Sequence, residues 1–393
     1  MKWPHIALGE LCSLVNGRAF KEEDWSKNGL PIIRIQNLNG DGASFNHWDG
    51  PLDKQVIVHT NDLLLAWSGT PGTSFGAHIW HGSEGVLNQH IFRVDLDSPR
   101  IDRKWAVRAI NDQLNHLITL AHGGVGLKHV TREVVQQLRI LLPPLEEQRR
   151  IAAILDKADA LRQKRRLGLR MFDSLTQSIF LDMFGDPVLN PFKWHRAPLS
   201  EVLARIDSGT SPVCLDRPAL QEEWGVLKLG AVTRCEFDGS QQKALPMNYS
   251  ADPELEVKPE DLLFTRKNTR ELVAACALVH STRPRLLLPD LIFRLVLRPG
   301  APVTKDYLHR LLIYPSKRKE MQMLAGGSAG SMPNISKGKL LDVLIEVPPA
   351  KLQLEFSRKV HQVRSLKETY RKAIEDQSAA FDSLQSRAFR GEL

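Results

Sequence analysis

The sequence predicts an α+β protein with two tandem globular domains of mixed α/β structure. Each domain is followed by a long helix, and the two helices are expected to pair as a coiled coil. Three observations predict this fold class. The chain repeats a set of short motifs in the same order, so it contains two copies of one unit. Each copy begins with short apolar and β-branched runs between turn residues, which is typical of many short strands. Each copy ends in a long polar segment with helical periodicity and no internal proline.

Four pairs of matching segments define the repeat, and their order along the chain is kept. The pairs are residues 3–11 with 194–202, 61–65 with 260–264, 142–148 with 347–353, and 172–175 with 381–384. The offsets are 191, 199, 205 and 209 residues. Chance can supply one such pair, but not four in register. The rising offset is what small loop insertions in the second copy would produce.

The globular part of each copy spans about 140 residues rich in Gly, Pro, Asn and Asp. Strands are expected at residues 31–35, 55–58, 63–67 and 91–94, and helices near 104–119 and 305–324. A further strand, at 138–142 and at 341–347, is closed by a Pro-Pro pair, because proline has a fixed φ and no N–H to donate. The predicted domains are 1–144 and 185–349, with long helices over 145–184 and 350–393.

Apolar residues at 3/4 spacing predict a coiled-coil stripe along each long segment. In the first copy the stripe is Ile151, Ile154, Ala158, Leu161, Phe172, Leu175 and Ile179, broken at Arg165 and Gly168. In the second copy it is Phe356, Val360, Val363, Tyr370, Ile374, Phe381, Leu384 and Ala388, interrupted by Lys367 and Gln377. Each helix of some 36 residues would be roughly 54 Å long, which exceeds the width of such a domain. Pairing of the two helices is therefore favoured over packing of each on its own domain.

Composition and charge favour a polyanionic partner, although only weakly by themselves. The net charge is +8, and residues 264–320 hold twelve Lys and Arg against four Asp and Glu. A solvated basic surface is an equally good interpretation of such a run. The four cysteines have neither metal-finger nor Cys-x-x-Cys spacing, the start of the chain does not look like a signal peptide, and no stretch is long and apolar enough for a membrane span. A reduced cytoplasm is the expected location, without a membrane partner.

A Pro-Pro-x-x-x-Gln motif at the start of each long helix is the most specific pattern of the sequence. It occurs at residues 143–148 and 348–353, and a Gly-rich segment at 123–131 precedes the first occurrence. Together with the repeated Trp-x-x-x-x-Leu opening and Asp-Leu-Leu element, this pattern resembles the specificity subunits of type I restriction–modification systems. The second copy departs from it, because it lacks the Glu before Gln353 and replaces the Gly-rich segment with residues 326–336.

The resemblance implies that each globular part is a target recognition domain that reads one half of a bipartite, asymmetric site in double-stranded DNA. It also implies that the helices pair antiparallel, space the two domains and dock methyltransferase subunits, of which two are expected. Restriction subunits would join through the complex. The chain itself would be a non-catalytic subunit without a bound cofactor, and S-adenosylmethionine, ATP and Mg²⁺ would belong to the partner subunits.

Base reading requires Arg, Asn or Gln at base edges, with Lys, Arg, Ser and backbone N–H groups on phosphates. The first-domain candidates, all expected in loops, are Arg18, Lys21, Arg34, Gln36, Asn37, Trp67, Ser68, Asn88, Gln89, Lys128 and His129. Those of the second domain are Lys228, Thr265, Arg266, Lys267, Asn268, Arg270, Arg283, Arg285, Ser328 and Ser331. For any single one of these residues a solvated loop position is as good an interpretation. For the cluster at 266–270, DNA contact is favoured.

Parts of the sequence are also compatible with two other functions. Asp238, Glu256 and Lys258 form a weak nuclease-like pattern, so a self-contained nuclease or methyltransferase is the enzyme alternative. No nucleotide-binding or S-adenosylmethionine-binding motif is present, and His78 and His81 lack a third ligand nearby for zinc. No catalytic and no metal-binding residue is therefore predicted. A long-helix scaffold without a role on DNA is the third alternative, and it predicts no salt-dependent DNA affinity.

Overall fold

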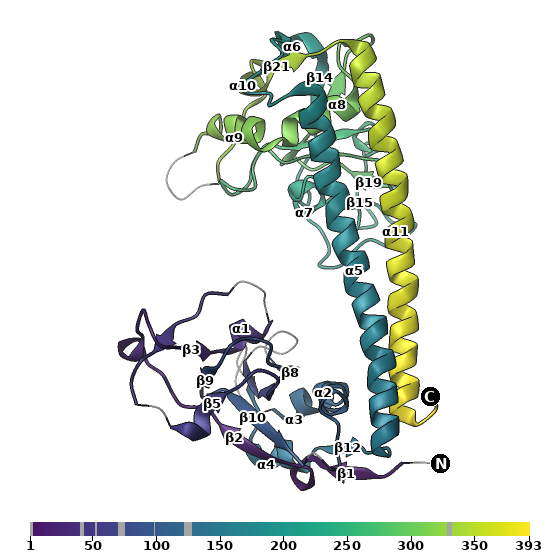
Figure 1. Ribbon diagram of the computed structural model, residues 1–393. Coiled ribbons are helices and arrows are strands. Elements are labelled where there is room, and N and C mark those ends of the chain that lie inside the picture. The colour runs from purple at the N-terminus through teal and green to yellow at the C-terminus, as the bar shows by residue number, and fades with distance from the viewer. Residues whose placement is uncertain are drawn as a thin grey trace. The chain divides into compact units, whose positions relative to one another are not determined.

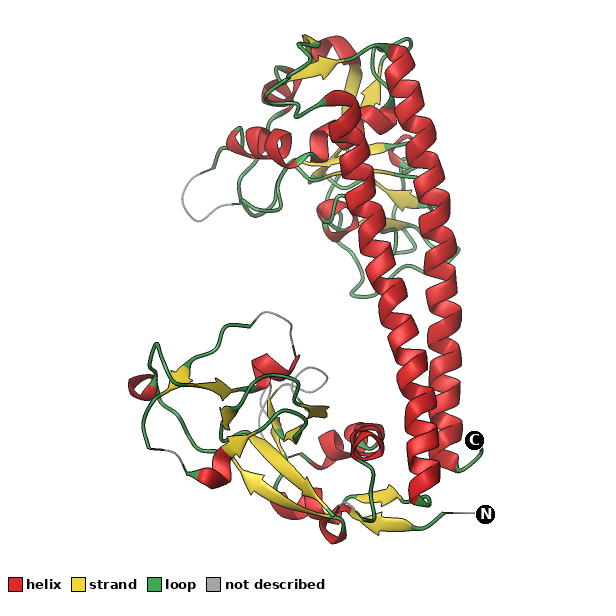
Figure 2. Ribbon diagram, in the orientation of Figure 1, coloured by secondary structure: helices red, strands yellow, loops and turns green. Residues whose placement is uncertain are grey.

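A computed structural model describes residues 3–39, 43–51, 53–69, 75–97, 99–121, 128–327 and 332–393 (Figure 1). The chain divides into two compact units. The first unit consists of residues 1–166 and 373–393, and the second consists of residues 167–372. Each unit therefore contains one globular domain and the parts of both long helices that pack on it (Figure 2).

The first unit contains two four-stranded sheets. One has the order β2-β10-β6-β8 and is antiparallel throughout. The other has the order β4-β3-β9-β5, in which β3 and β9 are parallel. The strands are β2 (Cys12–Asn16), β3 (Leu30–Ile33), β4 (His47–Trp48), β5 (Ile57–Val58), β6 (Leu63–Ala66), β8 (Gly76–Ile79), β9 (Gly85–Leu87) and β10 (Ile91–Leu96).

The second unit repeats this arrangement. Its four-stranded sheet has the order β14-β20-β17-β18, and its second sheet, β16-β15-β19, again contains a parallel pair, β15 with β19. The strands are β14 (Leu203–Ser208), β15 (Gly225–Leu227), β16 (Gln242–Ala244), β17 (Leu262–Thr265), β18 (Cys276–Leu278), β19 (Leu286–Leu287) and β20 (Ile292–Leu297). The predicted fold class, two tandem mixed α/β domains each followed by a long helix, is confirmed.

Short elements complete the two domains. The two-stranded sheets are β1 (His5–Ala7) with β12 (Arg139–Leu141), β7 (Ser68–Gly69) with β11 (Lys128–His129), and β13 (His195–Pro198) with β21 (Leu344–Val347). The α-helices are α1 (Ile35–Asn39), α2 (Arg103–Asp112), α3 (Leu114–Leu120), α4 (Arg132–Gln137), α6 (Leu199–Val202), α7 (Gly230–Thr233), α8 (Lys305–Ile313), α9 (Pro315–Met323) and α10 (Lys337–Leu341). The 3₁₀ helices are η1 (Leu8–Glu10), η2 (Glu22–Asp24), η3 (Lys54–Val56) and η4 (Pro253–Leu255).

Several predicted elements are shorter or broken in the structure. The helix expected at 305–324 is two helices, because Pro315 disfavours a helical conformation at Tyr314, whose ψ is 134°. The helix expected at 104–119 is interrupted at Gln113, and the strand expected at 31–35 gives way to α1. Residues 55 and 56 are in η3, and residue 341 ends α10 instead of starting a strand.

The long helices are α5 (Leu145–Phe184) and α11 (Ala350–Arg390), of 40 and 41 residues. In the first unit the start of α5 shares a core with the end of α11, through Ile151 and Phe381. In the second unit the end of α5 shares a core with the start of α11, through Phe180 and Phe356. Early residues of one helix thus meet late residues of the other within each unit, so the pairing is antiparallel.

Both predicted breaks in the α5 stripe have a structural reason. The Arg165 guanidinium donates to the carbonyl of Ala373 at 3.0 Å, so a polar side chain binds the backbone of the partner helix. A Cβ on Gly168 would lie 3.2 Å from the Tyr370 ring, which packs edge-on against Phe172. The small residue makes room for a ring at the seam.

The predicted stripe of α5 was wrong at two positions. Leu161 and Leu175 are 48% and 44% exposed, whereas Leu155, left out of the stripe, is fully buried. A helix with 3.6 residues per turn drifts relative to a strict seam, so an apolar pattern identifies the contacting face only approximately.

Candidate nucleic-acid interface

In the first domain, residues distant in sequence meet where two parallel strands end. Because β3 and β9 are parallel neighbours, Arg34 and Asn88, which follow them, lie at adjacent strand ends, and the Asn88 N–H donates to the Ile33 carbonyl at 3.1 Å. The backbones of Arg18 and Asn88 pair in an isolated parallel β-bridge. This approach requires Gly17, since a Cβ there would lie 2.0 Å from the Asn88 carbonyl oxygen. Arg18, Arg34 and Asn88 are thereby brought together.

Next to these strand ends lies a group that we call the first platform, which consists of Trp67, Phe92 and Arg132. The rings of Trp67 and Phe92 stack with centroids 5.4 Å apart, and the Arg132 guanidinium lies 5.9 Å from the Phe92 centroid. His90 packs edge-on against Trp67. Burial, with a contribution from the charge of nearby His129, lowers the pKa of His90, which therefore contributes a neutral imidazole near pH 7.

The second domain has a corresponding group, the second platform, which consists of Arg266, Phe293 and Lys337. The Arg266 guanidinium and the Lys337 ammonium lie 5.4 and 5.7 Å from the Phe293 centroid. Burial leaves the Arg266 Nε without a hydrogen-bond partner in the described structure. Both platforms have a cation near an aromatic ring, Arg132 near Phe92 and Lys337 near Phe293. Where Trp67 stacks on Phe92 in the first platform, the second platform has Arg266 near its ring.

Backbone hydrogen bonds show that the two platforms are equivalent. The N–H of Trp67 donates to the His90 carbonyl at 3.3 Å, and the N–H of Arg266 donates to the Leu291 carbonyl at 3.1 Å. On the other side, the carbonyl of Trp67 accepts from Val130 at 3.0 Å. The carbonyl of Arg266 likewise accepts from Ile335 at 2.8 Å. The frame is repeated while the side chain it presents has changed.

Arg132 and Lys337 were not among the residues predicted from the sequence. Each is exposed and is the first residue of a short helix, α4 or α10, whose N-cap hydroxyl is supplied by Thr131 or Ser336. A hydroxyl N-cap followed at once by a cation, shortly after each Gly-rich segment, is a signal that could have identified both.

Four predicted DNA contacts are instead bound within their own domain. Thr265 is fully buried, and its hydroxyl accepts from the Ala275 N–H at 2.8 Å. Asn268 is 6% exposed and accepts from the Thr269 N–H at 2.8 Å. Arg283 donates to the carbonyls of residues 220, 221 and 223, and Arg285 donates to the backbone and side chain of residue 222. These side chains hold loops of the domain together.

The other predicted residues are placed as follows. Gln36, Lys228, Arg270 and His129 are exposed, and Lys228 follows β15 as Arg34 follows β3. Lys21 pairs with Glu23 at 3.4 Å, Asn37 accepts from the Arg34 N–H, and Asn88 accepts from the Gln89 N–H. Ser68 is 5% exposed, and the backbone of Lys267 pairs with that of Asn334 in an isolated antiparallel β-bridge. Ser328, Ser331 and the side chain of Lys128 lie outside the described residues. The prediction that all first-domain candidates lie in loops was wrong, because Gln36 and Asn37 are in α1 and Ser68, Lys128 and His129 are in strands.

Many basic side chains of the run at 264–320 bind partners within the second domain. Arg294 is bound by Asp207 at 2.9 Å and by Asp261 at 3.4 Å. Lys317 is 2% exposed and lies 3.6 Å from the buried carboxylate of Glu346. The excess of positive charge in this segment is therefore not all on a surface open to DNA.

The residues of the nuclease-like pattern make hydrogen bonds within the second domain. The Glu256 carboxylate accepts from the Arg285 N–H at 2.6 Å, the Asp238 carboxylate accepts from the Ser240 N–H at 3.0 Å, and the Lys258 N–H donates to Asp261 at 2.9 Å. Within the described ranges, His, Cys, Asp and Glu do not gather in groups of three or more that could hold a metal ion. None of the helices that the structure describes is both long and apolar enough to cross a membrane.

Comparison with known proteins finds matches along the chain. Residues 1–169 match the family model described as the type I restriction modification DNA specificity domain. The chain is 32% identical to the EcoEI specificity subunit of Escherichia coli over 166 residues, which are 42% of this chain and 28% of that relative. It is 22% identical to the EcoBI subunit of Escherichia coli and to the MjaVIII subunit of Methanocaldococcus jannaschii, over all of this chain and 86% and 93% of theirs.

Among solved structures, the type I restriction–modification S subunit from M. genitalium matches 99% of this chain and 96% of its own, with a TM-score of 0.59. At 14% identity this match shows a shared fold.

Proposed function

Because this chain belongs to the family of type I restriction–modification specificity subunits, we propose that it recognises DNA, each globular domain reading one half of a bipartite, asymmetric target. The observation that carries the proposal is the pair of platforms. Their backbone frames are equivalent, whereas Trp67 in one is replaced by Arg266 in the other. Two readers with one frame and different side chains recognise different sequences, and hence an asymmetric site.

The proposed division of the chain is 1–144 and 185–349 for the two target recognition domains, and 145–184 and 350–393 for the spacer helices. The antiparallel helices act as a spacer of fixed length, so the unread gap between the half-sites is set by the protein, as dimer geometry sets half-site spacing in other DNA-binding proteins. In the first domain, Arg18, Arg34 and Asn88 meet at one edge and supply the donors and acceptors that base edges require. Arg132 contacts a phosphate. Lys337 does so too, because its ammonium donates to the Ile206 carbonyl at 2.7 Å and keeps further N–H donors for a phosphate.

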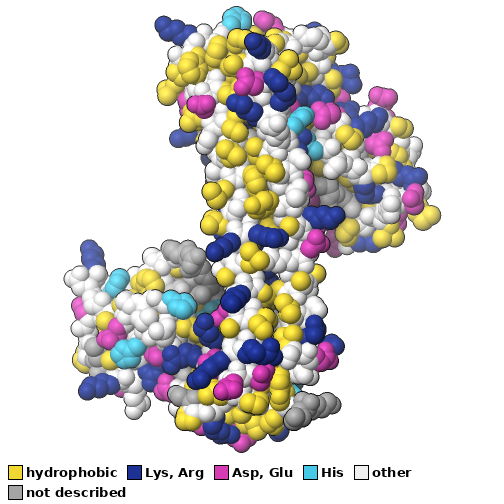
Figure 3. Space-filling model, turned by 45° about the vertical axis from the view of Figure 1, so that its right-hand side comes forward, with side chains coloured by type: hydrophobic (Ala, Val, Ile, Leu, Met, Phe, Trp, Pro, Cys, Tyr) yellow, Lys and Arg dark blue, Asp and Glu magenta, His cyan; other side chains and the backbone are white. Residues whose placement is uncertain are grey.

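The proposed partners are methyltransferase subunits, two per chain, that dock on the helices, and restriction subunits that join through them. In the second unit the paired helices expose Leu167 and Met171 of α5 and Leu366 of α11, at 54%, 64% and 53% exposure. Figure 3 shows hydrophobic side chains on the outer face of the helices. Exposed apolar patches of this kind are typical of protein interfaces. This chain is then a non-catalytic subunit, and S-adenosylmethionine, ATP and Mg²⁺ are bound by its partners.

The replacement of Arg266 by alanine is expected to relax base preference in one half of the target only, and to weaken binding of the assembled methyltransferase by about tenfold to a hundredfold, because a bidentate Arg contact is worth about 1–3 kcal/mol. Lys337→Ala should weaken binding to all sequences and reduce the slope of log K against log salt by about 1. Methylation-site mapping and DNA titrations at several salt concentrations measure both effects.

Lys319→Ala is the matched control, because Lys319 is an exposed lysine of the same domain, on α9. Exchange of residues 1–144 for the first domain of a relative should change the other half of the site. The proposal is wrong if Arg266→Ala leaves both half-sites and the affinity unchanged, or if the isolated chain itself methylates or cuts DNA.

A further inference from the structure

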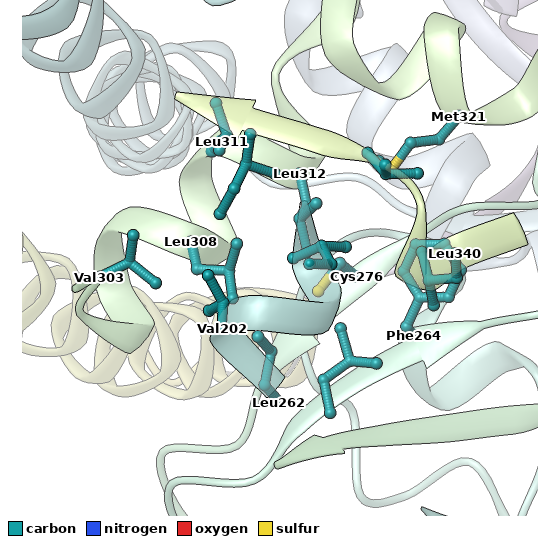
Figure 4. Packing of buried hydrophobic residues seen from close by; sticks show 14 of the residues in the cluster. Val202, Leu262, Phe264, Cys276, Val303, Leu308, Leu311, Leu312, Met321 and Leu340 are labelled. Atoms are coloured by element: carbon teal, nitrogen blue, oxygen red, sulfur yellow. The ribbon is translucent and has the colours of Figure 1, made fainter. Parts of the chain in front are cut away.

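A pocket of about 800 Å³ lies in the second unit, between the globular domain and the paired helices. Residues of α5, α8 and α11 line it, together with the segment 234–237. Leu308, Leu311 and Leu312 of α8 belong to the hydrophobic core (Figure 4). His309, Arg310 and Ile313, on another face of the same helix, line the pocket.

The internal repeat supplies a counterpart for comparison, a pocket of about 710 Å³ in the first unit lined by α2, α5 and β8. Trp105 of α2 donates to the Leu141 carbonyl of β12, and Tyr307 of α8 donates to the Glu346 carbonyl of β21. These two residues are therefore equivalent. Three residues further along each helix stand Arg108 and Arg310, so the two pockets present an arginine at the same place.

In the first unit this arginine is neutralised by the long helix. Arg108 lies 3.0 Å from Asp156 and 3.9 Å from Asp159, and Lys104 lies 2.8 Å from Asp156. The two carboxylates stand eight and eleven residues after Gln148, the glutamine of the Pro-Pro-x-x-x-Gln motif near the start of α5.

In the second unit the same two positions carry basic side chains in place of the carboxylates. Eight and eleven residues after Gln353 stand His361 and Arg364, and both are bound to Asp306 of α8 at 3.3 Å. An ion pair still links the domain to the long helix, but the acidic residue is now on α8 and the basic residues are on the long helix. Consequently the carboxylates that bind Arg108 have no counterpart beside Arg310.

Over the described residues Arg310 forms no ion pair, and its only hydrogen bond goes to the Asp173 carbonyl at 3.4 Å. Its Nε is buried without a partner. The nearby carboxylates are bound elsewhere, since Lys367 holds Asp173 at 2.6 Å and also binds Glu236. Burial lowers the pKa of Arg310, so an anion in the pocket would relieve the cost of holding this charge away from water.

We propose that this pocket binds a small molecule with a phosphate or carboxylate group on an apolar body. The Arg310 guanidinium takes the anionic group, because it is a planar donor without an acid partner. Leu278, Ile313 and Val360 in the wall take the apolar part. Such a site goes beyond DNA recognition and would act at the join between the second domain and the helices.

Calorimetric titration of the full chain, without DNA, with phenyl phosphate, benzoate and neutral benzyl alcohol tests the proposal. We expect at least one of the anions to bind and benzyl alcohol not to bind. Binding of phenyl phosphate alone assigns a phosphate ligand, and binding of benzoate alone assigns a carboxylate. Arg310→Gln should weaken binding by about tenfold or more, which is the loss of one charge-assisted hydrogen bond.

Arg108→Gln is the matched control and should leave binding unchanged, because that pocket already contains its carboxylates. Circular dichroism and the melting temperature verify that each variant folds. If Arg310→Gln does not fold, Ser281→Trp, at an exposed position in the lining, should block the pocket instead. Absence of binding by both anions, equal binding by benzyl alcohol, or binding that survives Arg310→Gln (or Ser281→Trp where that variant takes its place) would overturn the proposal. DNA recognition is measured separately and does not depend on this result.

Discussion

Replacing Gln148 by leucine is expected to destabilise the first unit by about 3 kcal/mol or more. Gln148 is fully buried at the start of α5. Its Oε1 accepts from the Asp102 N–H at 2.7 Å, and its Nε2 donates to the carbonyls of Pro143 and Arg100 at 2.8 and 3.1 Å. Leucine has a similar size but would leave three backbone groups without a partner, and each unsatisfied group costs about 1–3 kcal/mol.

Urea denaturation followed by circular dichroism measures this loss, and Gln353→Leu provides a second, independent case. Gln353 is also fully buried, and it binds the Thr304 N–H and the carbonyls of Pro302 and Pro348 at 2.8–2.9 Å. Gln177→Leu, on an exposed part of α5, is the control and should change stability by less than about 0.5 kcal/mol. Equal effects of the buried and the exposed substitutions would contradict this account of the motif.

Truncation of Phe180 to alanine is expected to cost the second unit about 3–5 kcal/mol, the usual loss for a large buried aromatic side chain. Phe180 is fully buried near the end of α5. Its ring centroid lies between 5.2 and 5.8 Å from those of Phe184, Tyr307, Tyr314 and Phe356. The cavity would therefore open at the place where both long helices and α8 pack together.

The neighbouring Leu181→Ala serves as control, because Leu181 is 45% exposed and its truncation should cost less than about 1 kcal/mol. The difference appears as a lower urea midpoint for Phe180→Ala at an unchanged m-value. If the two variants unfold at the same midpoint, the end of α5 is not part of the cooperative core of the second unit.

The architecture could be predicted from the sequence because it depends on patterns among neighbouring residues. Four matching segments in register are enough to show a duplicated fold, and proline-free helical periodicity is enough to show the long helices. The Pro-Pro-x-x-x-Gln motif was identified as a marker of the helix start. Its role as a buried hydrogen-bond hub became visible only when the structure placed residues 100–102 and 302–304 against it.

Which polar side chains are free to bind was decided by the tertiary structure alone. Arg283 and Arg294 look equivalent to Arg266 in a list of basic residues, yet the first holds a loop and the second is bound by two aspartates. Arg132 and Lys337 were not predicted from the sequence, yet each lies near an aromatic ring in one of the two matching platforms. The physical reason is that periodicity, turns and repeats are properties of neighbouring residues. The charge and hydrogen-bond partners of a side chain come from strands and helices far away in the chain, and only folding brings them together.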